Sequence, residues 1–257
     1  STLIRHAVGI YRQDSGELLV DGEPVYENPK IKARIAYIPD EVAYFTQSTI
    51  KDMMRFYKSM YPGFDQERFE KLGQDFRLSL NRPLRKMSKG MQKQAAFWLA
   101  LSCRPDYIVL DEPVDGLDPV MRRQVWSLLL SDVAERGSTV LVSSHNLREL
   151  EDVCDHVGIM NRGKMLLERS LSQLQDNMVK VQLALADGTE LPEGLDILHR
   201  SVTGRLQQLI LRGEAEEVTN KLATVQPLFM DVLPLSLEEI FIYELGGAVH
   251  EIKDILV

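Results

Sequence analysis

The sequence is poor in cysteine and lacks long apolar runs. Its two cysteines, Cys103 and Cys154, lie far apart without metal-ligand spacing, so each is expected to be a small buried or half-buried side chain. No apolar run approaches the length of a membrane span, and no signal peptide opens the 257 residues. We therefore expect a soluble, cytoplasmic polypeptide.

An excess of basic charge is also missing. The sequence has 38 Asp and Glu against 30 Lys and Arg, a formal net charge of −8, and its acidic residues are spread along the chain. Binding to DNA or RNA needs a basic face, so this balance argues against a nucleic-acid partner. With 44% hydrophobic residues and no internal repeat, the chain can bury one large core or two smaller ones.

What the sequence does contain is organised around an apolar run that ends in two acids. Residues 107–110 are rich in strand formers, and they predict a strand buried on both faces. Asp111 and Glu112 follow, and Pro113 should end the strand because it has no N–H to donate. Open α/β sheets bind ligands at this carboxyl edge. One carboxylate there can hold a hard cation while its neighbour orients or deprotonates a water, although a solvated turn is an equally good interpretation of the pair alone.

The surrounding pattern predicts an α/β fold. Further strands are expected at residues 35–38 and 139–143, and helices at residues 120–136 and 147–154. Strands that alternate with helices favour a mostly parallel, doubly wound sheet. The helical pattern at about 41–106 predicts a small helical subdomain inserted in that sheet.

A change of character near residue 170 predicts a second domain. Apolar and polar residues alternate over 179–185, as in a half-exposed strand, and Ser236 with Glu239 forms a capping box that opens a last helix. We expect a first domain over 1–168 and a small accessory α+β domain over 169–257, which carries no catalytic constellation.

Two further motifs point to the same sheet edge. Ser88 is a good N-cap and Gly90 lets a ligand approach the backbone, so the helix that begins here offers an anion site. His145 directly follows the strand at 139–143, and its ring should emerge beside the carboxylates. Taken singly, an ordinary capped helix and a structural histidine are the more common interpretations.

In this order, the motifs resemble those of the ATP-binding subunit of ABC transporters over roughly residues 1–168. The matching segments are residues 87–91 (signature sequence), 108–112 (Walker B strand), 116–118 (D-loop), 144–145 (switch histidine), 37–40 (Q-loop position) and 1–3 (tail of Walker A). The Lys-Gly-Met variant of the signature and the separate C-terminal domain are similar to ABC-2-type exporter subunits of Gram-positive bacteria.

The resemblance implies a RecA-like P-loop NTPase core that binds ATP and Mg²⁺. Asp111 and Ser1 would hold Mg²⁺, Glu112 would be the general base, and His145 would contact the γ-phosphate. The nucleotide-binding residues would be Ser1, Thr2, Asp40, Ser88, Lys89, Gly90 and Asp118. Of these, Ser88 and Gly90 would grip ATP on a second subunit, and Asp118 would line the interface between the two.

The implied partners are transmembrane permease subunits and a second nucleotide-binding subunit, in a homodimer or a heterodimer at the inner face of the cell membrane. We expect the permease to dock beside Asp40 on residues 42–61, where aromatic and methionine side chains cluster. The alternative is that these side chains build the core of the helical subdomain.

Two departures from the family pattern affect the expected activity. Asp40 places an anion where the family has glutamine, and the glycine-rich loop with its lysine is absent from the 257 residues. We expect the intact parent to carry additional residues and to be an ATPase, and the 257-residue chain alone to be inactive. If the loop is absent by nature, the alternative is a non-hydrolysing ABC-like dimerisation or regulatory module.

Overall fold

The computed structural model describes residues 1–186 and 188–245, in two compact units. The first unit is Ser1–His145 and the second is Asn146–Val257. This division lies before the boundary at residue 168 that the sequence suggests, because the hairpin at residues 156–170 is counted with the second unit. The functional domain boundary at residue 168 stays a prediction.

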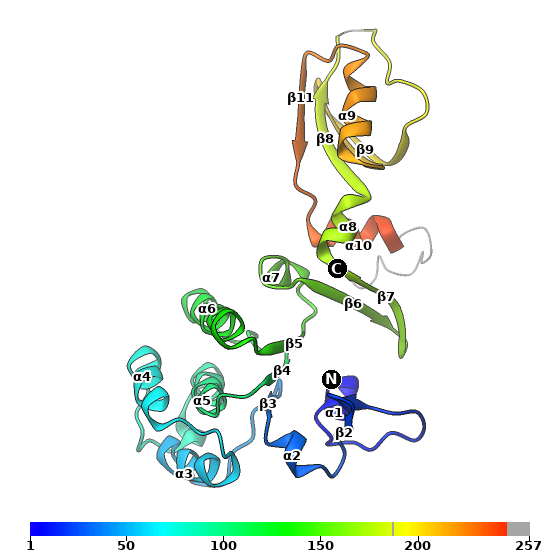
Figure 1. Cartoon of the computed structure of the whole chain (residues 1–257). Helices are drawn as coiled ribbons and strands as arrows, with labels where there is room; N and C mark the ends of the chain where they lie inside the picture. Colours follow the sequence, from blue (N-terminus) through cyan, green and yellow to red (C-terminus); the bar gives the residue numbers. More distant parts are fainter. Residues whose placement is uncertain (187, 246–257) are drawn as a thin grey trace. The chain divides into compact units, whose positions relative to one another are not determined.

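The first unit contains a three-stranded parallel sheet in the order β3-β4-β5 (Figure 1). Its strands are β3 (Ile35–Ile38), β4 (Tyr107–Asp111) and β5 (Thr139–Ser143). The chain reaches β3 through α1 (Thr2–Ala7), a short antiparallel pair of β1 (Leu19–Val20) and β2 (Glu23–Pro24), and α2 (Pro29–Lys32). The parallel sheet confirms the sequence prediction.

Strand β4 is buried on both faces, as predicted. Ile108 and Leu110 pack into the main core, whereas Val109 packs on the opposite face with the cluster around Ile4 and Ile31. Burying a side chain of this size contributes roughly 1.5–3 kcal/mol. Layers on both faces therefore hold the strand in place and direct its carboxyl end, with Asp111, to one edge of the sheet.

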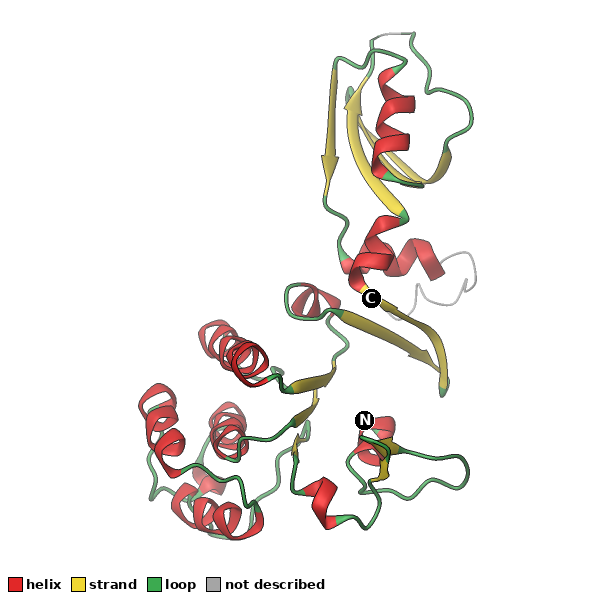
Figure 2. Ribbon diagram, viewed as in Figure 1, coloured by secondary structure: helices red, strands yellow, loops and turns green. Residues whose placement is uncertain are grey.

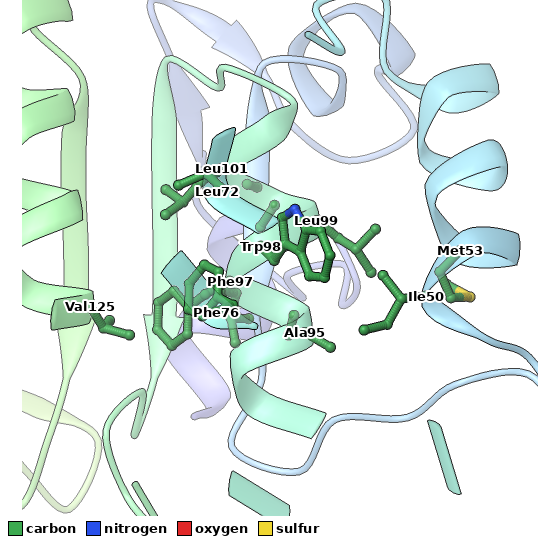
Figure 3. Close-up of a cluster of buried hydrophobic side chains, with 14 of the residues drawn as sticks. Ile50, Met53, Leu72, Phe76, Ala95, Phe97, Trp98, Leu99, Leu101 and Val125 are labelled. Atoms are coloured by element: carbon green, nitrogen blue, oxygen red, sulfur yellow. The ribbon is translucent and has the colours of Figure 1, made fainter. Parts of the chain in front are cut away.

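The predicted helical subdomain lies between β3 and β4. It consists of α3 (Ile50–Met60), α4 (Gln66–Phe76), the 3₁₀ turn η1 (Leu84–Lys86) and α5 (Lys89–Ser102). Helix α5 is buried almost all round over residues 95–102, and Figure 3 shows its side chains in one cluster with those of α3 and α4. Trp98 stacks on Phe69 with ring centroids 4.6 Å apart and donates from Nε1 to the Phe69 carbonyl at 2.7 Å. This packing fixes α5, and hence the direction of its N-terminus.

Helix α6 (Pro119–Arg136) connects β4 to β5. Asp118 caps its N-terminus by accepting from the backbone N–H groups of Val120 and Met121. Gly137 ends it with a φ of +67°, the left-handed conformation that glycine adopts at little cost. The helix predicted over residues 120–136 is thus confirmed.

The second unit contains an antiparallel sheet in the order β11-β8-β10-β9 (Figure 2). Its strands are β8 (Met178–Ala184), β9 (Asp196–Thr203), β10 (Leu206–Arg212) and β11 (Phe229–Leu233). A core of Val181, Leu183, Leu209 and Leu211 packs against α9 (Ala215–Ala223). The α+β character is as predicted, but β9 was missed because most of its residues are exposed.

The same unit holds the remaining elements. They are α7 (Leu147–Glu151), the antiparallel pair β6 (His156–Asn161) and β7 (Lys164–Ser170), α8 (Leu171–Asp176) and α10 (Leu237–Leu245). Helix α7 ends at residue 151, three residues before the predicted end. In α10 the predicted capping box is present, because Ser236 and Glu239 exchange hydrogen bonds. Residues 246–257 of the expected accessory domain lie outside the described residues.

Over residues 1–186 and 188–245, no helix combines the length and the hydrophobicity that crossing a membrane requires.

Candidate functional site

Asp111 is the buried anion at the centre of the candidate site. It ends β4 opposite Ser143 of β5, whose hydroxyl donates to Asp111 Oδ1 at 2.6 Å. The Ser1 hydroxyl donates to the same oxygen at 3.1 Å. Burial on its own would raise the pKa of Asp111, but the hydrogen bonds from Ser143 and Ser1, together with the positive charge of the Ser1 amino group, outweigh it and lower this pKa. Asp111 is therefore ionised at neutral pH although only 2% of its surface is exposed.

Glu112 follows in a backbone conformation that glutamate rarely adopts. Its φ is +46°, and left-handed residues other than glycine cost about 1–3 kcal/mol. The turn is held by hydrogen bonds: the Glu112 N–H donates to the Ser143 carbonyl at 3.1 Å. Such strain concentrates at functional sites. Because of this turn, the Glu112 side chain leaves the backbone in a different direction from that of Asp111.

His145 lies beside Glu112. Its Nδ1 is 3.0 Å from Glu112 Oε2, and its side chain is 78% exposed. The predicted meeting of the histidine with the carboxylates at one sheet edge is confirmed. A base that is hydrogen-bonded to a second polar group, at an edge open to ligands, has the geometry needed to act on a water.

Lys93 was missed by the sequence analysis. Its side chain is only 6% exposed, and its ammonium lies 3.7 Å from Asp40 Oδ1. The same Nζ donates to the carbonyl oxygens of Glu112 at 2.6 Å and of Asp115 at 3.3 Å. The signal available in the sequence was a charged residue just before a continuous apolar helical run. Asp40, at the Q-loop position, thus has a cation as its neighbour.

A second group of predicted site residues lies at the N-termini of α5 and α6. Ser88 caps α5 by accepting from the Met91 N–H at 3.2 Å, and Lys89 is exposed in its first turn. A Cβ added to Gly90 would lie 2.9 Å from the Gly116 carbonyl oxygen, so this glycine permits close contact with the D-loop. The signature-like segment and the loop before Asp118 therefore touch within one chain.

Thr2 opens α1 and is exposed. Its carbonyl oxygen lies 2.8 Å from His6 Nδ1, whereas the contact with Asp111 is made by the Ser1 hydroxyl. The structure thus brings Ser1, Asp111, Glu112 and His145 together, and it places Thr2 next to that group in sequence only.

The donor set around Asp111 fits Mg²⁺. It consists of oxygen atoms, a carboxylate that is ionised and a hydroxyl within 3.1 Å of it. Mg²⁺ is usually held by one or two carboxylates, with waters and substrate phosphates completing its octahedron. Asp111 and Ser1 are therefore suitable ligands for a Mg²⁺–nucleotide complex.

The sequence and the fold both match one class of protein. Residues 1–115 match the family model described as ABC transporter. The chain is 30% identical over 250 residues to the ABC transporter ATP-binding protein YtrB of Bacillus subtilis (strain 168), covering 96% of this chain and 85% of that protein. This similarity agrees with the resemblance to subunits of Gram-positive bacteria.

Solved structures give the same result. An ATP-binding subunit of an ABC transporter superposes with a TM-score of 0.62 at 25% identity, covering 68% of this chain and 75% of that chain. A dimeric ATP-binding cassette bound to ADP and Pi shares the fold, with a TM-score of 0.59 at 19% identity over 66% of this chain and 79% of that one.

The fold is that of an ABC-type ATP-binding domain with a RecA-like P-loop core. The chain belongs to the ATP-binding proteins of ABC transporters, a family whose members are normally ATPases.

Proposed function

We propose that the intact protein to which these residues belong hydrolyses ATP at the edge formed by β4 and β5, and that the hydrolysis drives an ABC transporter. The observation that carries the proposal is the convergence of the ionised Asp111 with the Glu112–His145 pair. The buried carboxylate can hold a metal ion, which would neutralise phosphate charge, and the neighbouring Glu112–His145 pair supplies a base.

In the proposed mechanism, Glu112 accepts a proton from the water that attacks the γ-phosphorus. The bond between the γ-phosphorus and the bridging oxygen breaks, and ADP and inorganic phosphate leave. His145 lies against Glu112 and is exposed enough to contact the γ-phosphate. Asp111 and Ser1 would hold Mg²⁺, which supplies positive charge to the phosphate oxygens. Ser143 orients Asp111 through its 2.6 Å hydrogen bond.

Ser88, Lys89 and Gly90 are proposed to act on nucleotide held mainly by a second subunit, and Asp118 to line the interface between the two subunits. The first three lie at the N-terminus of α5, where free amides and the helix dipole favour phosphate. Their exposure supports these roles: Ser88, Lys89 and Asp118 all lie at the surface of the single chain. The solved dimer bound to ADP and Pi supports a two-subunit arrangement by its fold.

The test is hydrolysis by the native subunit purified with its membrane partner. We expect ATP turnover that stops when EDTA removes divalent cations and returns when Mg²⁺ is added in excess. Turnover that persists without free divalent cations would contradict the proposed role of Asp111 and Ser1.

A non-hydrolysing dimerisation or regulatory module is the alternative function. It predicts a dimer that forms with ATP but releases no phosphate in the same assay. The Glu112–His145 contact favours hydrolysis. The inactivity expected for a polypeptide confined to residues 1–257 stays a prediction, and calorimetry with MgATP tests it.

For the permease, we propose a docking surface on the helical subdomain. A groove of about 810 Å³ is lined mainly by apolar and aromatic side chains of residues 43–61. The sequence left two interpretations open, and each applies to part of the cluster. Met53 is buried in the core, and Tyr44, Met54 and Tyr57 pack against it. Phe45 (60%), Phe56 (40%) and Met60 (59%) are exposed.

The exposed members carry the docking proposal. Phe45 and Phe56 contact each other edge to face, with centroids 5.2 Å apart. Exposed aromatic and methionine side chains are enriched in protein interfaces. We propose that a cytoplasmic segment of the permease occupies this groove, which would place the subunit at the inner face of the membrane.

Phe45→Glu and Met60→Glu should uncouple hydrolysis from transport. Each puts a charge on the proposed interface, and loss of a central apolar anchor costs about 2 kcal/mol or more of binding free energy, roughly 30-fold in affinity. Co-purification with the permease and substrate transport should fall, while the melting temperature stays unchanged. Leu130→Glu, at another exposed apolar residue on α6, is the matched control. A drop in melting temperature in the groove variants alone would assign these residues to the core.

A further inference from the structure

Lys93 is a buried charged residue just ahead of the apolar part of α5. Its side chain is 6% exposed, and residues 95–101 that follow it are all buried. Burying an ammonium group is costly unless it is paired and hydrogen-bonded. The partners of Lys93 therefore show which part of the structure its buried charge stabilises.

Those partners are mostly main-chain atoms of one turn. Nζ donates to the Glu112 carbonyl at 2.6 Å and to the Asp115 carbonyl at 3.3 Å. The Asp115 N–H also donates to the Glu112 carbonyl, at 3.4 Å, so the ammonium reaches both ends of a closed turn. Hydrogen bonds with an ionised donor are roughly twice as strong as neutral ones. Lys93 thus holds the peptide plane that follows Glu112.

The third partner supplies opposite charge without adding rigidity. Asp40 Oδ1 lies 3.7 Å from Nζ, and the Asp40 side chain is 51% exposed. An ion pair this long and this exposed stabilises little. The geometric constraint therefore comes from the two carbonyl oxygens, and it acts on a residue, Glu112, whose φ of +46° needs external support.

We propose that Lys93 is a positioning residue for ATP hydrolysis. By fixing the left-handed turn at Glu112, it sets the direction in which the Glu112 carboxylate leaves the sheet edge, toward His145. This inference rests on the proposed function, in which Glu112 activates the attacking water. Lys93 acts through Glu112, so its loss should affect the chemical step more than the binding of nucleotide.

The test compares Lys93→Met with Lys71→Met in the native subunit bound to its membrane partner. Lys71 is an exposed lysine of α4 in the same subdomain. Misplacing a catalytic group by about 1 Å can cost on the order of 10²-fold in rate. We expect Lys93→Met to lower kcat by about 10- to 100-fold with KM for ATP changed less than about twofold, and Lys71→Met to behave like the wild type. Lys93→Gln, which keeps an N–H donor, should restore part of the loss.

Two further measurements separate positioning from general stability. Thermal unfolding gives the folded fraction at the assay temperature, and a loss of kcat that only follows this fraction overturns the proposal. In a Glu112→Gln background, Lys93→Met should lower the residual rate no further, because both changes act on the same group. Additive losses, or wild-type kcat in Lys93→Met, also overturn it. Full activity of Glu112→Gln alone would refute the proposed function, and this inference with it.

Discussion

Replacing Glu112 by glutamine should lower the rate of ATP hydrolysis by about 10²–10⁴-fold, the usual contribution of a general base. Glutamine has nearly the same shape and can keep the contact with His145, but its amide cannot accept a proton from water. The backbone at residue 112 should keep its left-handed turn, because Lys93 and Ser143 bind main-chain atoms there. Phosphate release under saturating MgATP measures the effect.

The same variant should still bind ATP and should accumulate as an ATP-bound dimer. Size-exclusion chromatography with and without MgATP detects that species. A matched control is Glu135→Gln on α6, an exposed glutamate whose carboxylate accepts from Ser131 and lies outside the site. Unchanged steady-state hydrolysis in Glu112→Gln would remove this residue from the mechanism.

The parallel sheet of the first unit was predictable because its strands are short apolar runs ended by polar residues. The run that forms β4 is buried on both faces, so it is apolar throughout and shows no alternation of apolar and polar residues. Strand β9 shows the opposite case. Asp196–Thr203 is largely exposed, and its pairing with β10 depends on backbone hydrogen bonds that composition does not reveal.

In the candidate site, the residues that are adjacent in sequence to strand ends were found, whereas Lys93, which reaches the site from the middle of a helix, was not. Asp111, Glu112 and His145 follow strands, so the topology of a parallel sheet brings them to one edge. Lys93 contacts the main chain of residues 112 and 115, some 20 positions away, and helical periodicity gives no information on such a partner. Ser143 was seen as a strand residue, and only the register of β4 against β5 places it opposite Asp111.

The exposed aromatic cluster shows a further limit of the sequence. Spacing on α3 indicates which residues share a helix face, but whether that face is covered depends on α4 and α5. Met53 is buried while Phe56, three residues later, is 40% exposed. Helical spacing alone could not separate the core members from those that line the groove.

Replacing Asp111 by asparagine should also abolish most of the hydrolysis, for a reason that can be distinguished from the loss of Glu112. Asparagine keeps an oxygen that can accept from Ser143 and Ser1, so the geometry at the end of β4 should persist. It removes the negative charge that a bound Mg²⁺ requires. A metal ion contributes several kcal/mol to charge stabilisation in the transition state, so its weakened binding should cost roughly 10²–10³-fold in rate.

The measurement is the hydrolysis rate as a function of free Mg²⁺ concentration. In Asp111→Asn the half-maximal concentration should rise, and part of the rate should return at high Mg²⁺, whereas Glu112→Gln should not respond. Ser143→Ala is the matched comparison, because it removes the 2.6 Å hydrogen bond to Asp111 and leaves the charge in place. We expect a smaller loss of rate there and a weaker shift in the Mg²⁺ dependence. If Asp111→Asn loses activity with an unchanged Mg²⁺ dependence, the carboxylate acts by holding β4 and β5 together, and the metal has other ligands.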